Sequence, residues 1–115
     1  MADDRRHPAD HEREAAARPA LAALIAALET HNIDALSGLL REDAAWLSAD
    51  GTSEGPAARR RARGFAAEHL GRRWADPQQR GAHAVLRWGA SDGGAIGALV
   101  VEVRAGQIVL VCEVP

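Results

Sequence analysis

The chain lacks several residue types on which protein chemistry often depends. Its 115 residues include no Lys and no Tyr, only one Cys, and three Trp and one Phe as the aromatic residues. A single cysteine, Cys112, excludes an intrachain disulfide and a cysteine-rich metal site. No segment approaches the roughly 18 consecutive apolar residues of a membrane helix. The sequence therefore predicts neither a disulfide-stabilised domain nor a membrane-spanning helix.

Charge gives an equally limited indication of partners. All 14 basic residues are Arg and the net charge is −2, which gives no general attraction to nucleic acid or to an anionic membrane. We interpret the absence of Lys and the abundance of Ala as the coding bias of a GC-rich bacterial genome. The N-terminal stretch has no apolar segment typical of a secretion signal. We therefore expect a cytoplasmic location, without nucleic-acid or membrane partners.

The length favours a single domain with one modest core. A chain of 115 residues buries about two thirds of the surface that its unfolded state exposes. Residues 1–17 are polar and have no apolar periodicity, which predicts a flexible N-terminal arm followed by one domain over 18–115. His7 and His11 have the spacing of two metal ligands, but Pro8 lies between them and no third ligand is near. A solvated arm, with no bound metal, is the favoured interpretation.

Helical periodicity occupies the first part of the domain. Pro19 suits a first helical turn, and Asn32 suits both the end of that helix and the N-cap of the next. The run around Phe65 predicts a third, short helix that stops at Gly71 or soon after. The apolar residues that repeat at i, i+3, i+4 and i+7 in the first two helices are Leu21, Leu24, Ile25 and Leu28, then Ile33, Leu36, Leu39 and Leu40.

Beyond Asp43 the apolar period falls to two, which predicts a strand. This strand places Trp46, Ser48 and Asp50 on one side and ends in a turn at "ADGTSEGP". The stretch "AARRRARG" that follows fits either a short returning strand or the start of a helix.

The last third predicts an antiparallel meander. The segments "AHAVLRWGA", "AIGALVVEVR" and "IVLVCEV" are joined by short Gly-containing turns at "SDGG" and "AGQ", and connections this short join antiparallel neighbours. The last two strands are apolar on both faces. We therefore expect helices to cover one face and a second subunit to cover the other, giving a homodimer through the sheet.

Two acidic residues interrupt these apolar strands. Glu102 and Glu113 follow the outward register of the strands. They fit either ion-pair partners at an interface or edge charges that discourage aggregation.

The order of these elements resembles the NTF2-like cone. "LAALIAALETHNIDALSGLLREDAAWLSADG" is similar to the opening of SnoaL-like domains, in which two helices lead into a strand. "GPAARRRARGFAAEHLGRR" and "GALVVEVRAGQIVLVCEV" resemble the third helix and closing hairpin of the SnoaL-like accessory domain of extracytoplasmic-function sigma factors. The resemblance implies an α+β fold with about three N-terminal helices packed on a curved antiparallel sheet. The chain carries no sigma-factor helices and departs from that domain's glycine-rich loop at "ADGTSEG".

Enzymes of this superfamily include steroid isomerases, polyketide cyclases and epoxide hydrolases, which use carboxylates inside the cone. The resemblance places Ser48 where a steroid isomerase has its basic Asp, and Leu99 near the position of its acidic oxyanion partner. The chain also has no Tyr. The catalytic pair of that enzyme class is therefore missing.

Two other residues are candidate acid–base groups. If the strand face that carries Trp46 lines the cone, Asp50 lies at the mouth of the cone. Asp-Gly is also a common turn signature, and a simple turn is the favoured interpretation. His83, at the start of the meander, is a candidate because histidine as a residue type exchanges protons near neutral pH, but an exposed histidine at a strand end is favoured. Tuned carboxylate chemistry needs an enclosed pocket and a nearby charge or donor.

The pocket itself is predicted from large apolar residues, since rigid aromatic side chains commonly line ligand sites. Single Trp residues in a small domain also serve as core or interface anchors. The predicted lining residues are Trp46, Ser48, Phe65, Trp88, Leu99 and Val101.

The arginine run offers a further candidate surface. No aromatic stacking platform accompanies the arginines, so a solvated, acid-paired surface is favoured over a phosphate-binding patch. The residues concerned are Arg59, Arg60, Arg61, Arg63, Arg72 and Arg73.

Three functional hypotheses follow. The first is a small-molecule-binding SnoaL-like protein with an apolar pocket, with or without acid–base turnover of the isomerase, cyclase or hydrolase kind and without a cofactor. The second is a non-catalytic regulatory or protein-interaction module like the sigma-factor accessory domain. The third is a structural domain whose cone is filled by its own side chains.

Overall fold

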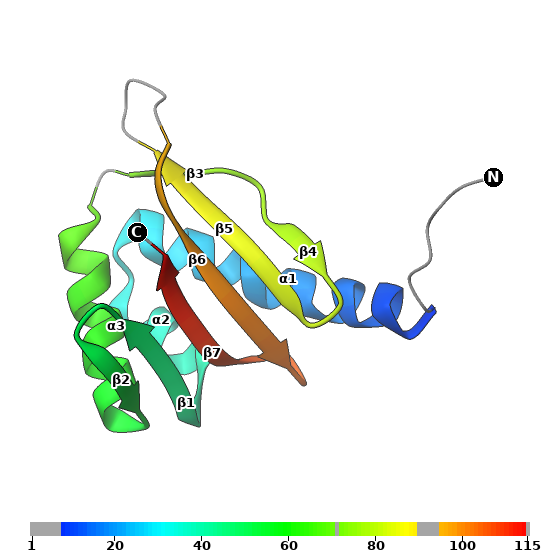
Figure 1. Cartoon of the computed structure of the whole chain (residues 1–115), viewed down its shortest axis with the longest axis horizontal. Coiled ribbons are helices and arrows are strands. Elements are labelled where there is room, and N and C mark those ends of the chain that lie inside the picture. The colour runs from blue at the N-terminus through cyan, green and yellow to red at the C-terminus, as the bar shows by residue number, and fades with distance from the viewer. Residues whose placement is uncertain (1–7, 71, 90–94, 115) are drawn as a thin grey trace.

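The computed structural model describes residues 8–70, 72–89 and 95–114, which form three helices and a sheet of seven strands (Figure 1). The helices are α1 (Pro8–Thr30), α2 (Ile33–Leu39) and α3 (Pro56–Glu68). The strands are β1 (Leu40–Ser48), β2 (Gly51–Glu54), β3 (Arg73–Trp74), β4 (Gln78–Arg80), β5 (His83–Gly89), β6 (Ala95–Arg104) and β7 (Gln107–Val114).

Helix α1 is longer than the sequence pattern predicts. It begins at Pro8, so Pro19 lies inside the helix and not in its first turn. The part of the predicted arm from Pro8 to Ala17 is therefore helical, and Glu14 and Ala17 are buried. Alanine favours the helical conformation by itself, without a large side chain to bury. This part of α1 therefore has no stripe of large apolar residues, and its helical period is not visible in the sequence.

The junction between the first two helices is confirmed. Helix α1 ends at Thr30, and His31 takes the left-handed backbone conformation with φ 54°. The side chain of Asn32 then accepts a hydrogen bond from the amide of Ala35 at 3.2 Å, which makes Asn32 the N-cap of α2. A tight corner thus reverses the chain and carries it into β1.

The predicted turn after β1 contains a strand of its own. Ala49 and Asp50 form a two-residue turn, and β2 returns beside β1 as an antiparallel hairpin. Strand β1 also begins at Leu40, earlier than the predicted start after Asp43. The open question about "AARRRARG" is settled, because these residues lie in α3, with Pro56 in its first turn.

The predicted meander is confirmed for β5, β6 and β7, which pair antiparallel in chain order. The full order is β2-β1-β7-β6-β5-β3, with β4 also paired to β5. The β1–β7 pairing is parallel, so the sheet is mixed and not wholly antiparallel as predicted. Strands β3 and β4 have two and three residues, too short to show a period. The "AGQ" turn is present, whereas "SDGG" lies outside the described residues.

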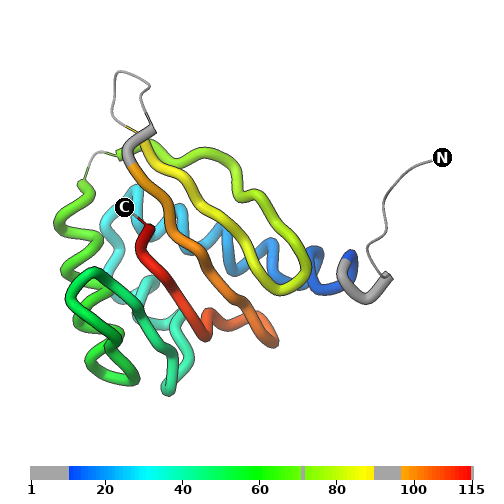
Figure 2. The backbone as a smooth tube through the Cα atoms, in the orientation of Figure 1, coloured from blue at the N-terminus to red at the C-terminus, as the bar shows by residue number. Residues whose placement is uncertain are grey.

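The two apolar faces of the sheet have different surroundings. The helices pack on one face, which we call the inner face, and the sheet curves around them (Figures 1 and 2). Trp46, Val111, Val101 and Leu86 are fully buried there and lie on neighbouring strands. The outer face carries half-buried apolar residues that no described helix covers. Among the described residues, no helix is long and apolar enough to cross a membrane.

Candidate functional site

Most of the residues that were predicted to line a pocket belong to the buried core between the helices and the inner face of the sheet. Five of the six are buried, and the sixth, Ser48, is half-buried at the end of β1, where its hydroxyl accepts a hydrogen bond from the amide of Asp50 at 3.3 Å. The five buried residues are Trp46, Phe65, Trp88, Leu99 and Val101.

The aromatic side chains among them pack against one another. We call the group Trp46, Phe65, His69, Trp74 and Trp88 the aromatic cluster. The Phe65 ring lies 5.5 Å from Trp46, 5.6 Å from Trp88 and 3.9 Å from His69 between centroids, the last in a stacked arrangement. These are contact distances for aromatic rings. The middle of the cluster is thus filled, while its edge at His69 and Trp74 is half-exposed.

A charged pair lies beside the cluster on the inner face. Glu113 pairs with buried Leu99 in the β6–β7 register, so the predicted outward orientation of Glu113 is wrong. Its Oε1 accepts from Arg61 Nη2 at 2.8 Å, and its Oε2 accepts from Arg61 Nε at 2.8 Å and from Trp46 Nε1 at 2.5 Å. A carboxylate can face the core here because α3 supplies a cation directly above it.

These hydrogen bonds determine the protonation state of Glu113. Burial raises its pKa, but the hydrogen bonds from Arg61 and Trp46 outweigh burial and hold the pKa below its ordinary value. Glu113 is therefore ionised at neutral pH and has no proton to donate. The pair is suited to holding a polar group of a ligand, and poorly suited to acting as a general acid.

His69 provides the one imidazole ring of the cluster. Its Nδ1 lies 2.8 Å from the carbonyl oxygen of Phe65. A carbonyl only accepts hydrogen bonds, so Nδ1 carries the proton, and in the neutral ring Nε2 keeps its lone pair. His69 is half-buried and lies close enough to Glu113 that a positive charge on its ring lowers the pKa of that carboxyl. The ring can thus stack on a ligand and accept a hydrogen bond from it.

The two candidate acid–base residues lie elsewhere. Asp50 is exposed in the turn between β1 and β2. His83 is exposed at the start of β5, with its Nε2 3.2 Å from Glu102 Oε1. Neither residue makes a hydrogen bond or ring contact with the aromatic cluster among the described residues. Their positions support the turn and exposed-strand-end interpretations.

The arginine run divides between surface and interior. Arg61 binds both inward Glu113 and exposed Glu68, the latter at 3.2 Å. Arg59 Nη2 donates to the carbonyl oxygen of Leu40 at 3.1 Å and so ties α3 to β1. Within the described part of the chain, no three metal-ligating side chains are close enough to hold a metal ion.

Comparison with known proteins rests on structure alone, since no family model and no curated protein match the sequence. An NTF2-like protein of unknown function from Burkholderia xenovorans has a TM-score of 0.67 to this structure, at 21% identity, over 88% of this chain and 83% of its own. The chain has the NTF2-like fold.

Two further structures with this fold carry functional descriptions. A protein described as a polyketide cyclase from Sinorhizobium meliloti has a TM-score of 0.66 at 18% identity, over 83% of this chain and 93% of its own. A protein described as a ketosteroid isomerase from Kribbella flavida has a TM-score of 0.64 at 17% identity, over 86% and 76%. The predicted NTF2-like architecture is confirmed, whereas likeness to the sigma-factor accessory domain stays a prediction.

The sequence patterns do not reveal the polar half of this site. The arginine run predicts a solvated surface for Arg61, the strand register predicts an outward Glu113, and no motif distinguishes His69 within the helix predicted around Phe65. One signal was present, because Phe65 and His69 are separated by four residues and so share one face of α3. No local pattern indicates that Arg61 reaches Glu113, which is 52 residues away along the chain.

Proposed function

We propose that the protein binds a small, largely apolar organic molecule at the half-exposed edge of the aromatic cluster. The observation that carries this proposal is the position of His69 and Trp74, two half-buried rings, beside the Arg61–Glu113 pair. Flat apolar ligands gain affinity from aromatic walls, and a few fixed polar groups orient them. The described functions of structures with the same fold, a polyketide cyclase and a ketosteroid isomerase, are compatible with such a ligand.

His69 gives the proposed site its chemical character. Its Nδ1 is occupied by the Phe65 carbonyl, so Nε2 accepts a hydrogen bond from a ligand hydroxyl. If the protein turns its ligand over by acid–base chemistry, His69 is the residue that would take the proton, because Glu113 is held by three hydrogen bonds. Asp50 and His83 remain alternative bases, to be compared as Asp50→Asn and His83→Gln.

A titration with 2-naphthol tests the binding proposal, since this probe combines a flat apolar ring system with one hydroxyl. We expect saturable shifts of the Trp74 and Trp88 indole signals in two-dimensional NMR spectra. Trp74→Ala should weaken binding by about tenfold, which corresponds to about 1.4 kcal/mol. The matched control is Leu47→Ala on the outer face, which should bind as the unmodified chain does.

A second variant separates stacking from hydrogen bonding. His69→Phe keeps an aromatic ring but removes Nε2, so it should weaken 2-naphthol and leave naphthalene binding unchanged. Equal loss for both probes would contradict the proposed role of Nε2. No saturable shift with either probe, or a normal affinity of Trp74→Ala, would overturn the ligand site.

A non-catalytic interaction module is the second candidate function. Trp46 and Phe65 are fully buried, and the contacts between the rings fill the middle of the cluster, which supports a domain that works through its surface. The outer face supplies such a surface, with Leu47, Val85, Val100 and Cys112 half-buried and in register across four strands. We propose that a second copy of the chain covers it, because an apolar sheet face is self-complementary in a two-fold dimer.

A further inference from the structure

A hollow lies at the end of β5 opposite to the aromatic cluster, beneath the first half of α1. It has a volume of about 460 Å³. Its walls are one side of α1 at residues 13–17, the connection between β4 and β5 at 80–83, and the turn between β6 and β7 at 103–106. We call residues 8–18 of α1 the cover helix, because this part of α1 stands over the hollow.

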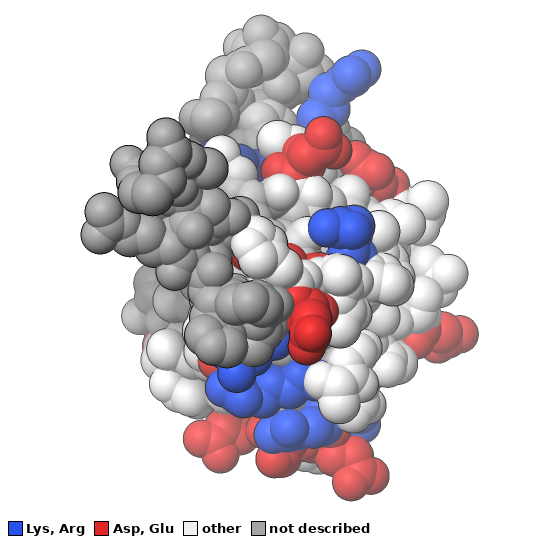
Figure 3. Space-filling view, turned by 90° about the vertical axis from the view of Figure 1, so that its right-hand side faces the viewer, with Lys and Arg blue, Asp and Glu red and all other residues white. Residues whose placement is uncertain are grey.

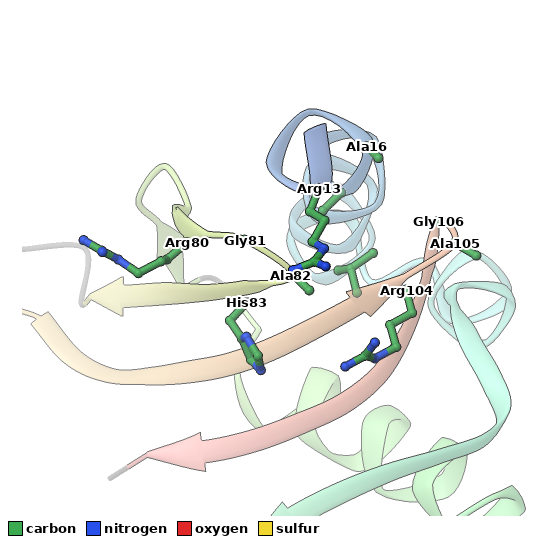
Figure 4. Close-up of a pocket in the computed structure, with 11 residues that line it drawn as sticks. Arg13, Ala16, Arg80, Gly81, Ala82, His83, Arg104, Ala105 and Gly106 are labelled. Atoms are coloured by element: carbon green, nitrogen blue, oxygen red, sulfur yellow. The ribbon is translucent and has the colours of Figure 1, made fainter. Parts of the chain in front are cut away.

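The side chains around the hollow do not fill it. In Figure 4 those of His83 and Arg104 extend to the side of the strands away from α1, Arg80 also points away, and Arg13 extends toward Ala82. Most of the other lining residues are small, namely Ala16, Ala17, Gly81, Ala105 and Gly106. The cover helix therefore has few side chains to pack against across the hollow.

Burial divides α1 into two halves at Pro19. Among residues 11–18, only Glu14 and Ala17 are buried. An isolated helix shorter than about 12 residues is marginally stable in water, so the cover helix depends on its contacts with the rest of the chain. The apolar residues that anchor α1 in the core all follow Pro19, and they are Ala20, Leu21, Leu24, Ala27 and Leu28.

Pro19 also weakens the connection between the two halves. It has no amide hydrogen, so the helical hydrogen bond to the carbonyl oxygen of Ala15 is missing, and its ring crowds that carbonyl. The Pro19 side chain is exposed, so bending at this residue does not disturb the core. Such bending separates the cover helix from the sheet while residues 20–30 stay packed.

Hydrogen bonds to the β4–β5 hairpin hold the cover helix in place. Glu14 Oε1 accepts from the amide of Gly81 at 3.1 Å. Gln79 Nε2 donates to the carbonyl oxygen of Glu14 at 2.7 Å. Both bonds converge on Glu14, so this one residue joins the cover helix to the sheet where apolar packing is sparse.

We propose that the cover helix opens and closes over the hollow, with Pro19 as its hinge and the Glu14 hydrogen bonds as its latch. Opening exposes Ala17 and Val103, two small buried residues that line the hollow. Figure 3, which views this end of the molecule, shows basic and acidic side chains interspersed over the surface, and such groups stay hydrated in both positions. The movement does not depend on the ligand proposed for the aromatic cluster, which lies at the other end of β5.

Amide hydrogen exchange, followed by NMR, tests the hinge. The amides of residues 12–18 report on the cover helix, whereas those of residues 24–28 have their helical acceptors beyond Pro19. We expect the first set to exchange at least tenfold faster, through a local opening that low concentrations of denaturant do not accelerate. Pro19→Ala restores the missing amide hydrogen, so it should slow the exchange of residues 12–18 by about tenfold.

Two further variants test the latch. Glu14→Ala removes the side-chain acceptor, and Gln79→Ala removes the donor to the Glu14 carbonyl oxygen. Each should speed the exchange of residues 12–18 by about tenfold, the factor expected for one lost hydrogen bond, and leave residues 24–28 unchanged. Alanine has the highest helix propensity, so faster exchange in Glu14→Ala cannot come from a weaker helix. The matched control is Glu12→Ala at an exposed position of α1, which should change the exchange less than twofold.

Thiol labelling measures access to the hollow itself. Val103→Cys, made in a Cys112→Ser chain, should react about tenfold faster with a maleimide when Glu14→Ala is added, because the buried side chain at this position is reached when the cover helix opens. Equal labelling rates in the two chains would show that the hollow is reached without movement of the helix, and would overturn its role as a cover.

The exchange data can also overturn the proposal. Equal exchange in both halves of α1 in the unmodified chain would exclude a hinge at Pro19, as would unchanged or faster exchange in Pro19→Ala. An equal acceleration of both halves by Glu14→Ala would show that Glu14 stabilises the whole fold and is not a latch.

Discussion

At the scale of single residues, the Arg61–Glu113 pair is the most consequential interaction on the inner face. The Glu113 side chain is only 17% exposed and lies among apolar neighbours. A charge in that position needs a partner, because an unpaired buried carboxylate is strongly unfavourable. Arg61 and Trp46 supply three hydrogen bonds to it. The pair thus connects α3, β1 and β7 at the edge of the proposed ligand site.

Glu113→Gln should lower the free energy of unfolding by about 2 kcal/mol at pH 7, since it removes the charge from hydrogen bonds that each stabilise by about 1.5–3 kcal/mol. Urea denaturation measures the change. The matched control is Glu68→Gln, which removes the exposed partner of Arg61 and should cost less than about 1 kcal/mol. Equal losses in the two variants would contradict the special role of Glu113.

The pH dependence of stability follows from the same pair. The folded-state pKa of Glu113 lies below its ordinary value, so its contribution is present above the unfolded-state pKa and is lost as the pH falls through the folded-state pKa. The unmodified chain should therefore lose stability on acidification more steeply than Glu113→Gln. Parallel stability curves for the two proteins between neutral and acidic pH would exclude this linkage.

At the scale of elements, the pairing of β5 and β6 depends on a close approach between Gly97 and Trp88. These residues are partners in the register, and a Cβ atom on Gly97 would lie 2.4 Å from the Trp88 ring. The Trp88 ring in turn contacts Phe65, His69 and Trp74. Glycine thus makes room for the ring that joins the sheet to α3.

Gly97→Ala should destabilise the protein by about 1–3 kcal/mol, because the added methyl group displaces a ring that is packed on several sides. Gly38→Ala is the control, since nothing lies within 4 Å of a Cβ there. Alanine in α2 should stabilise by about 0.5–1 kcal/mol through helix propensity. Thermal unfolding should show a lower melting temperature for Gly97→Ala and a higher one for Gly38→Ala. An unchanged melting temperature of Gly97→Ala would show that the Trp88 ring moves aside freely.

At the scale of the whole molecule, the helices leave the outer face of the sheet uncovered. Strands β6 and β7 are apolar on both faces over most of their length, and Val85 of β5 adds to the outer face. A contiguous apolar surface of this kind commonly marks an interaction site. The proposed homodimer would cover it and would leave the aromatic cluster on the inner face unchanged.

Val100→Arg should convert the proposed dimer to a monomer, because a charge at the centre of an apolar interface cannot be solvated there. The side chain is half-buried on the outer face, so Arg can extend into water in a monomer without unfolding it. Light scattering measures the molecular mass. Ala23→Arg, on the exposed side of α1, should leave the mass unchanged, and a monomeric unmodified chain would refute the dimer.

Much of the fold follows from patterns within the sequence. The spacing from Leu21 to Leu28, the Asn32 cap and the period-two strands predicted the elements. The resemblance of their order to the NTF2-like cone implied the architecture. Local errors occurred where no period could form, as at the alanine-rich start of α1, or where a strand was only a few residues long, as at β2 and β3. Trp46, Phe65 and Trp88 were predicted to line a pocket because they are large and rare, and the contacts between their rings follow only from the tertiary structure.

The sequence by itself therefore determined most of the helices and the longer strands, and that both faces of the last two strands are apolar, because these depend on spacing between near neighbours. Only the tertiary structure decided that Glu113 faces inward to Arg61 and that Phe65 brings Trp46, His69 and Trp88 together. These outcomes depend on the β-sheet register and on the angle at which each helix crosses the sheet. Neither is encoded in any local stretch, since each is set by the packing of the whole core.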